Sequence, residues 1–133
     1  MAVAAFVLAI GKAQAYDNGA VAQYVGEFIR AGTKPPAIEA AYYAPMGVDY
    51  FDQGILSRDQ ILNDIADYDA RWPVRSFEIA SDLDIRWGDH FAVVNFTLAY
   101  ELHNGTKHRS GVIPEAICVT TAGQIIAIAN HRF

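Results

Sequence analysis

The period of the hydrophobic pattern changes once along this chain, at Val74. Before that residue, apolar side chains recur every three to four positions, which is typical of helices that bury one face. After it, apolar and polar side chains alternate, as in strands that have one buried face. This order predicts an α+β domain of three N-terminal helices packed on a curved antiparallel sheet of four to five strands, with a pocket between the layers.

Caps and breakers predict where the first two helices begin and end. Asp17 or Asn18 can cap the first helix, and Gly32 is placed to end it. Pro36 suits the first position of a short second helix, which Pro45 stops. Both helices therefore precede the strand region.

A third helix is predicted from Ser57 to Pro73. Ser57 and Gln60 have the spacing of a capping box, in which each side chain accepts a hydrogen bond from the other's backbone. The apolar stripe of this helix is Ile61, Ile65, Tyr68 and Trp72. Asp64 falls on the opposite face, where we expect solvent.

Two hairpin signals divide the strand region, Gly88-Asp89 and Asn104-Gly105. Both sequences favour two-residue loops, and the register that follows gives neighbouring strands the same buried face. The pairs that result are Trp87 with His90 and Tyr100 with Arg109.

Glu115 is the charged residue that this register turns inward, on the same face as Phe96 and Leu98. A carboxylate on an apolar face is costly unless it is paired or protonated. Glu115 is therefore either a structural hydrogen-bond hub or a functional acid/base group whose pKa is raised by burial. Pro114 can mark a bulge that would reverse this orientation.

The last turn decides which residue faces Glu115. A two-residue loop at Ala122-Gly123 places Asn130 there, whereas a three-residue loop ending in a left-handed glycine places His131 there. Asn130 can hydrogen-bond a carboxylate, and His131 could also pass a proton near neutral pH.

Aromatic side chains that carry polar groups are frequent on the helices and the facing strand. Such stripes usually form core, but each buried hydroxyl needs a partner, and a lined pocket supplies one. The candidate pocket walls are Tyr50, Tyr68, Trp72 and Tyr100, with Arg109 placed to contact an anionic group.

The order of these elements resembles the nuclear transport factor 2-like superfamily, which includes ketosteroid isomerases and polyketide cyclases. The stretches 48–51, 57–59 and 68–73 also look like a group of bacterial, often exported members. The resemblance covers about residues 17 to 133 and implies a cystatin-like cone with a pocket at its wide end and frequent dimerisation through the sheet. The catalytic residues of those enzymes have no matching positions here.

The first fifteen residues are similar to a signal peptide. Ala2 to Ile10 is a continuous apolar run, and Ala13-Gln14-Ala15 supplies small residues at the positions that a signal peptidase reads. No Lys or Arg precedes the run, so an ordinary buried helix is the alternative. We expect a signal peptide at 1–15, a single domain at 16–133, and a periplasmic or secreted location.

Several classes of partner are disfavoured by composition. The formal net charge is −5 and the basic residues are scattered, which disfavours nucleic acid. No apolar run is long enough to span a membrane. The histidines lack paired metal-ligand spacing, and we expect no metal or other cofactor. The outer sheet face is apolar enough to suggest a homodimer through Phe91, Val93, Ala99, Val112, Ala116 and Cys118.

Three functions are compatible with this sequence. The first is an exported binding domain that encloses a small apolar or weakly anionic ligand, oriented by Glu115 and Asn130 or His131. The second is an acid/base enzyme of isomerase, cyclase or dehydratase type that uses Glu115 or His131. The third is a dimeric interaction module whose pocket is filled by its own side chains.

Overall fold

The computed structural model of the protein describes residues 17–133. The predicted signal peptide at 1–15 and its cleavage after Ala15 lie outside these residues, and export stays a prediction. None of the helices in the described part of the chain is long and apolar enough to cross a membrane.

Three helices form where the caps and breakers predict them. The Asp17 carboxylate accepts a hydrogen bond from the Ala20 amide at the start of the first. The capping box of the third is complete, since the Ser57 and Gln60 side chains each bond the other's backbone amide. The helices are α2 (Asn18–Ala31), α3 (Pro36–Ala40) and α4 (Arg58–Arg71), and a 3₁₀ turn, η2 (Phe51–Gln53), lies between the last two.

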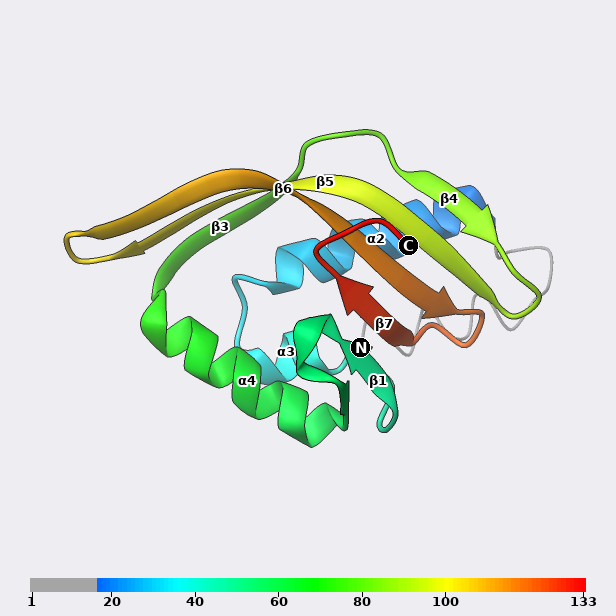
Figure 1. The fold of residues 1–133 in the computed structure, drawn as a ribbon, viewed down its shortest axis with the longest axis horizontal. Helices are drawn as coiled ribbons and strands as arrows, with labels where there is room; N and C mark the ends of the chain where they lie inside the picture. The colour runs from blue at the N-terminus through cyan, green and yellow to red at the C-terminus, as the bar shows by residue number, and fades with distance from the viewer. Residues whose placement is uncertain (1–16) are drawn as a thin grey trace.

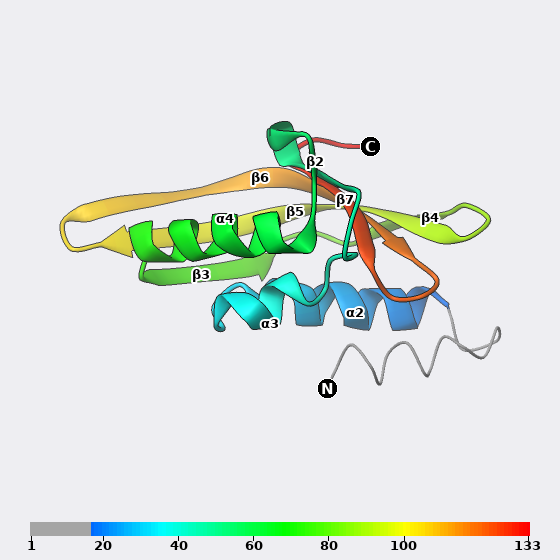
Figure 2. The ribbon, with the colours of Figure 1, turned by 90° about the horizontal axis from the view of Figure 1, so that it is seen from below.

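The sheet arches over these helices, which all lie on its concave side (Figure 1). Seen from below, α4 runs in the same direction as β5 and β6, and α3 and α2 lie beside it (Figure 2). The strands are β1 (Val48–Tyr50), β2 (Ile55–Leu56), β3 (Val74–Ile79), β4 (Asp84–Trp87), β5 (Phe91–Asn104), β6 (Lys107–Thr120) and β7 (Ile125–Ala129).

The described sheet has seven strands in the order β2-β1-β7-β6-β5-β3, with β4 also paired to β5. This exceeds the expected four to five, because the strand predicted after Val74 divides into β3 and β4 and the short strand β2 was not foreseen. The sheet is also not purely antiparallel, since β1 pairs with β7 in parallel. The α+β architecture with helices on one face is as predicted.

Two hairpin registers differ from the predicted ones by two residues. Trp87 pairs with Ala92 rather than His90, and Tyr100 pairs with Gly111 rather than Arg109. The loop of the second hairpin is 105–106 rather than the predicted 104–105. Because side chains alternate with a period of two, a shift of two residues leaves every side chain on its predicted face. No bulge occurs at Pro114, which pairs with Thr97.

The core between helices and sheet contains buried tyrosines whose hydroxyl groups have partners. Tyr24 is 1% exposed, and its hydroxyl lies 3.0 Å from the carbonyl oxygens of both Tyr42 and Gly123. This contact joins α2 to the turn between β6 and β7. Tyr43 is also buried and packs edge to face against Phe28. Some of the aromatic residues of the helices therefore belong to the core, which is one of the two roles that the sequence suggests for them.

The outer sheet face is less exposed than the sequence predicts. Val112 is exposed, but Ala116 and Cys118 are buried. The C-terminal residues lie on this face, where the Phe133 amide donates to Asn95 at 3.0 Å and Arg132 pairs with Asp84 at 2.6 Å. The apolar patch is thus smaller than expected, and the homodimer stays a prediction.

Candidate functional site

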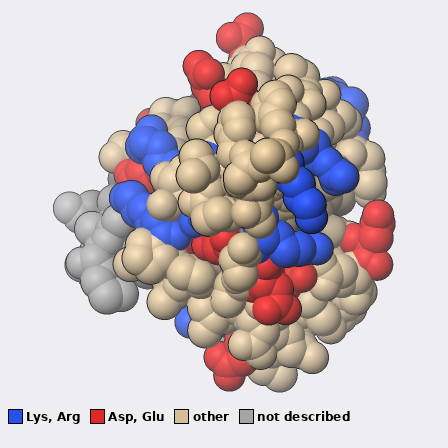
Figure 3. Space-filling model, turned by 90° about the vertical axis from the view of Figure 1, so that its left-hand side faces the viewer, with Lys and Arg blue, Asp and Glu red and all other residues tan. Residues whose placement is uncertain are grey.

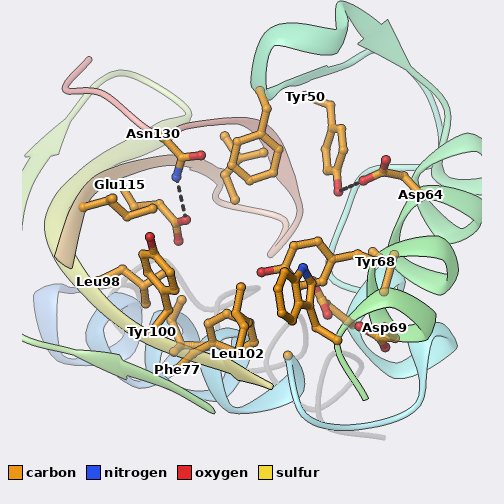
Figure 4. A pocket seen from close by; sticks show the side chains of 18 of the residues that line it. Tyr50, Asp64, Tyr68, Asp69, Phe77, Leu98, Tyr100, Leu102, Glu115 and Asn130 are labelled. Carbon is orange, nitrogen blue, oxygen red and sulfur yellow. Dashed lines mark hydrogen bonds between the residues drawn. The ribbon is translucent and has the colours of Figure 1, made fainter. Parts of the chain in front are cut away.

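A pocket of about 560 Å³ lies between the concave face of the sheet and helices α3 and α4. Figure 4 shows side chains from both layers pointing into it. Seven of the eight predicted site residues line it, and they are Tyr50, Tyr68, Trp72, Tyr100, Arg109, Glu115 and Asn130. The cavity argues against the alternative of a pocket filled by the protein's own side chains.

Glu115 points inward from β6, as the predicted register requires, and is 5% exposed. Its one side-chain partner within residues 17–133 is the Asn130 amide, which donates a hydrogen bond at 3.4 Å. The pKa of Glu115 is raised to about 8, first by burial and then by the negative charge of Glu39, while the Asn130 hydrogen bond opposes the shift. Glu115 is therefore mostly protonated at neutral pH.

Asn130 reaches Glu115 by a route that neither predicted loop describes. The loop has three residues, 121–123, with Gly123 left-handed at φ 78°, and it pairs Thr120 with Gln124, which by itself would bring Ala129 rather than the predicted His131 opposite Glu115. A register shift between Cys118 and Val119 then moves β7 by one residue and restores Asn130.

His131 is consequently outside the pocket. Its side chain is exposed, and its Nδ1 atom contacts the Arg132 carbonyl oxygen at 3.0 Å. The predicted pairing of His131 with Glu115 is wrong, because the three-residue loop directs Ala129 toward Glu115 and the register shift that follows replaces Ala129 by Asn130.

Glu39 on α3 is a pocket residue that sequence reasoning missed. Its pKa is raised to about 7, first by burial and then by the Asp69 charge, while the Arg75 charge opposes the shift. A five-residue helix is too short to show an apolar stripe, so nothing in the pattern indicates which way Glu39 points. The signal available was only an acidic residue three positions before a buried tyrosine pair.

The prediction that Asp64 faces solvent is wrong, because Asp64 lines the pocket. The buried Tyr50 hydroxyl donates to Asp64 at 2.9 Å, and the Gln53 amide donates to its other oxygen at 3.2 Å. Phe51, between these donors, has φ 49°, a left-handed conformation that is unusual for a non-glycine residue. The turn η2 thus directs Tyr50 toward α4.

A largely buried ion pair braces the pocket beside Glu39. Arg75 donates to Asp69 at 2.8 Å, with exposed side-chain fractions of 10% and 13% respectively. The same guanidinium donates to the carbonyl oxygens of Gly32, at 2.7 Å, and Trp72. Arg75 therefore joins β3 to the ends of α2 and α4, and its hydrogen-bonding capacity is largely occupied.

The end of the pocket near the β5–β6 hairpin tip carries two arginines, and we call it the arginine end. Arg109 lies 5.8 Å from the ring centroid of Trp72, and Arg71 lies 5.8 Å from that of Tyr68. Both arginines are exposed. Figure 3 shows this end of the molecule, where basic and acidic side chains lie close together rather than in separate patches.

Tyr100 is on β5, and its ring lies over Gly111, its partner on the neighbouring strand β6. A Cβ atom at Gly111 would come within 2.9 Å of the Tyr100 hydroxyl, so glycine is what lets the ring lie there. In Figure 4 the hydroxyl points toward Glu115. The site thus combines a protonatable acid, a phenol and an amide around an apolar cavity.

The chemistry of the lining favours organic ligands over metal ions. Within residues 17–133 no group of three or more His, Cys, Asp or Glu side chains is placed to hold a metal. Rings and aliphatic side chains make up most of the walls, as in sites for small molecules, and nine further lining residues have charged or amide side chains, five of them acidic.

The comparisons with known proteins find the fold but no sequence relative. A scan against protein-family models and a search of curated proteins both give no match. Among solved structures, a nuclear transport factor 2-like superfamily protein from Salmonella enterica superposes with a TM-score of 0.72 at 11% identity, covering 84% of this chain and 87% of that one.

Two further structures have similar scores. A protein from Xanthomonas campestris, described as a calcium/calmodulin-dependent protein kinase II association domain, has a TM-score of 0.69 at 20% identity, covering 86% and 89% of the two chains. One from Streptomyces avermitilis, described as a dehydratase from the same family as the Salmonella protein, scores 0.68 at 13% identity, covering 82% and 90%. These likenesses, carried by geometry rather than sequence, identify this chain as one with the nuclear transport factor 2-like fold.

Proposed function

We propose that this domain binds a small, mainly apolar molecule in the pocket, with the polar group of that molecule at Glu115 and Asn130. The observation that carries the proposal is Glu115, a buried carboxyl group that opens on a cavity and has, within residues 17–133, one hydrogen bond, which is long at 3.4 Å. A buried acid that served only structure would be expected to have its hydrogen bonds satisfied by the protein. A ligand group in the cavity completes them.

The cavity is also suited in size and lining to a small organic molecule. Its volume of about 560 Å³ lies within the usual range of roughly 300 to 1,000 Å³ for ligand pockets. The arginine end is where a weakly anionic group of the ligand would lie, next to Arg109. The residues before the domain are the basis for placing it in the periplasm or outside the cell, because they match the pattern of a signal peptide.

The binding proposal is tested by filling the cavity. Ile113 lines the pocket and the adjacent Val112 lies on the outer face, so Ile113→Trp blocks the site and Val112→Trp is its matched control. A library of small aromatic fragments is titrated into the full chain and followed by NMR. We expect hits that shift the amides of Glu115 and Leu98, that persist in Val112→Trp and that disappear in Ile113→Trp. Hits that bind both variants equally would overturn the pocket as the site.

Acid/base catalysis is the second candidate, and one observation favours it. Glu115 and Glu39 have pKa values raised to about 8 and about 7, so near neutral pH one can accept a proton while the other holds one. A solved structure of this fold is described as a dehydratase. The test is deuterium exchange at the α-carbon of acetophenone, which wild type should accelerate and Glu115→Gln should not. Equal exchange by both proteins would remove this candidate.

A homodimer through the outer sheet face is a separate proposal, supported by the exposed Val112 and Phe91 on neighbouring strands. Sedimentation of the wild type at micromolar concentration tests it. A dimer that Val112→Asp converts to a monomer would support it, and a wild-type monomer would remove it.

A further inference from the structure

Two carboxyl groups of the pocket lack a cationic partner. Glu115 receives one hydrogen bond, from the neutral Asn130 amide. The Glu39 side chain makes no hydrogen bond or ion pair within residues 17–133, although it is only partly exposed. We call these two residues the carboxyl centre. Buried carboxyl groups are normally paired or fully hydrogen-bonded, so the carboxyl centre is short of positive charge.

The groups that face the carboxyl centre do not supply that charge. Around Glu39 lie Asp64 and Asp69 from α4 and Arg75 from β3, and Arg75 is engaged with Asp69 and two carbonyl groups. Around Glu115 lie Glu39 and the hydroxyl groups of Tyr43 and Tyr50. Two further acidic groups, Asp64 and Asp69, and two phenols thus surround the two carboxyls, against one cation that is already paired.

Aromatic rings in the same cavity add to its affinity for positive charge. The face of an aromatic ring carries negative potential and attracts ammonium and guanidinium groups. Two rings of this pocket already hold cations, since Arg109 lies over Trp72 and Arg71 lies over Tyr68. Tyr50 and Tyr100 also line the cavity, and neither has a cation over its ring within residues 17–133.

We infer that the ligand of this pocket carries an organic cation, an ammonium group on an apolar body, which lies between Glu39 and Glu115 against the neighbouring rings. The inference rests on the proposed binding function and specifies the chemical class of the ligand. An anionic group could belong to the same molecule only at the arginine end. Arg109 and Glu115 are six residues apart on β6, about 20 Å at the usual strand rise, so the two ends are well separated.

Proton release is the signature that distinguishes a cation from a neutral ligand. Without ligand, the raised pKa values of about 7 and about 8 keep Glu39 and Glu115 largely protonated below those values. A bound cation favours the ionised forms, and therefore lowers both pKa values and displaces protons. Its affinity must then increase as pH rises toward about 8, whereas that of a neutral acceptor ligand must not.

The test uses two probes of nearly the same shape, phenyltrimethylammonium and the neutral tert-butylbenzene. Neither probe titrates, so any pH dependence comes from the protein. With the full chain, NMR titrations should give at least tenfold tighter binding of the ammonium probe at pH 8. The affinity of that probe should rise at least tenfold from pH 6 to pH 9. Glu115→Gln and Glu39→Gln should each reduce both effects, and the exposed Glu78→Gln should leave them unchanged.

The outcomes separate this inference from the proposed function. Pocket binding of tert-butylbenzene with equal or greater affinity, and no pH dependence for either probe, would overturn the cation and leave the binding function intact. Binding of the ammonium probe that is unaffected by Glu115→Gln and Glu39→Gln would place it elsewhere and also overturn the inference. Binding of neither probe, together with fragment hits that survive Ile113→Trp, would overturn both.

Discussion

The two charged regions of the pocket differ in whether the protein itself satisfies them. At the arginine end, Arg109 and Arg71 lie over aromatic rings and are open to water. At the carboxyl centre, Glu115 is buried and Glu39 is half-buried, and within residues 17–133 the Asn130 amide is their one side-chain hydrogen-bond partner. Charges that are solvated and stacked gain little from a ligand, whereas buried unpaired groups gain much. The difference indicates that the carboxyl centre, rather than the arginine end, determines what the pocket binds.

The largest expected effect is on the pH dependence of stability, through Glu115→Gln. The pKa of Glu115 is about 8 in the folded protein, against an ordinary value of 4.5 for a solvated glutamate. Between these two pH values the folded state therefore binds one proton more than the unfolded state. Stability is then highest at low pH, falls as pH rises to about 8, and is level above it. One proton corresponds to a slope of about 1.4 kcal/mol per pH unit. Urea unfolding from pH 5 to pH 9 should show that Glu115→Gln removes much of this decline.

Glu78→Gln is the control for that measurement, because Glu78 is exposed on β3. It should keep the wild-type slope. A slope that persists in Glu115→Gln would mean that Glu115 is solvated in the folded protein, and the contrast between the two regions would lose its basis.

A smaller effect is expected from Tyr50→Phe, which removes the hydroxyl that bonds Asp64 between the two regions. Hydrogen bonds to charged groups contribute about 1.5–3 kcal/mol, so the loss of stability should be about 2 kcal/mol. Tyr68→Phe is the matched control, since Tyr68 also lines the pocket and its hydroxyl makes no hydrogen bond within residues 17–133. Thermal or urea unfolding of both variants gives the comparison. Equal losses would show that the Asp64 contact adds nothing.

The inward face of Glu115 was predictable from sequence because face depends only on parity. Both hairpin registers were misjudged by two residues, and the orientation of Glu115 survived. The partner of Glu115 was not predictable in the same way, because a one-residue register shift between Cys118 and Val119 exchanges Ala129 for Asn130 opposite Glu115. A register error of two residues leaves a strand side chain on its predicted face, whereas an error of one residue moves it to the opposite face.

Glu39 and Asp64 were missed for a different reason. Each lies on a helix whose orientation about its axis is fixed by tertiary packing rather than by a clear apolar stripe. Helix α3 has five residues, and α4 buries only Ile61 and Ile65, so its pocket-facing side is polar. Periodicity identifies the side that is packed into a core, but it carries no information on a side that faces a cavity. The acidic character of the pocket therefore became apparent only with the sheet in place above the helices.

The smallest effect is expected at the arginine end, from Arg109→Met, which keeps the aliphatic stem and removes the guanidinium. An exposed cation over a ring contributes about 0.5–1 kcal/mol. A double-mutant cycle with Trp72→Leu, measured by urea unfolding, should therefore give a coupling energy of at most about 1 kcal/mol. A coupling of about 2 kcal/mol or more would indicate that Arg109 is shielded from water against Trp72. In that case the arginine end would resemble the carboxyl centre in holding a desolvated charge, and a ligand's negative group would contribute to selectivity as strongly as its cation.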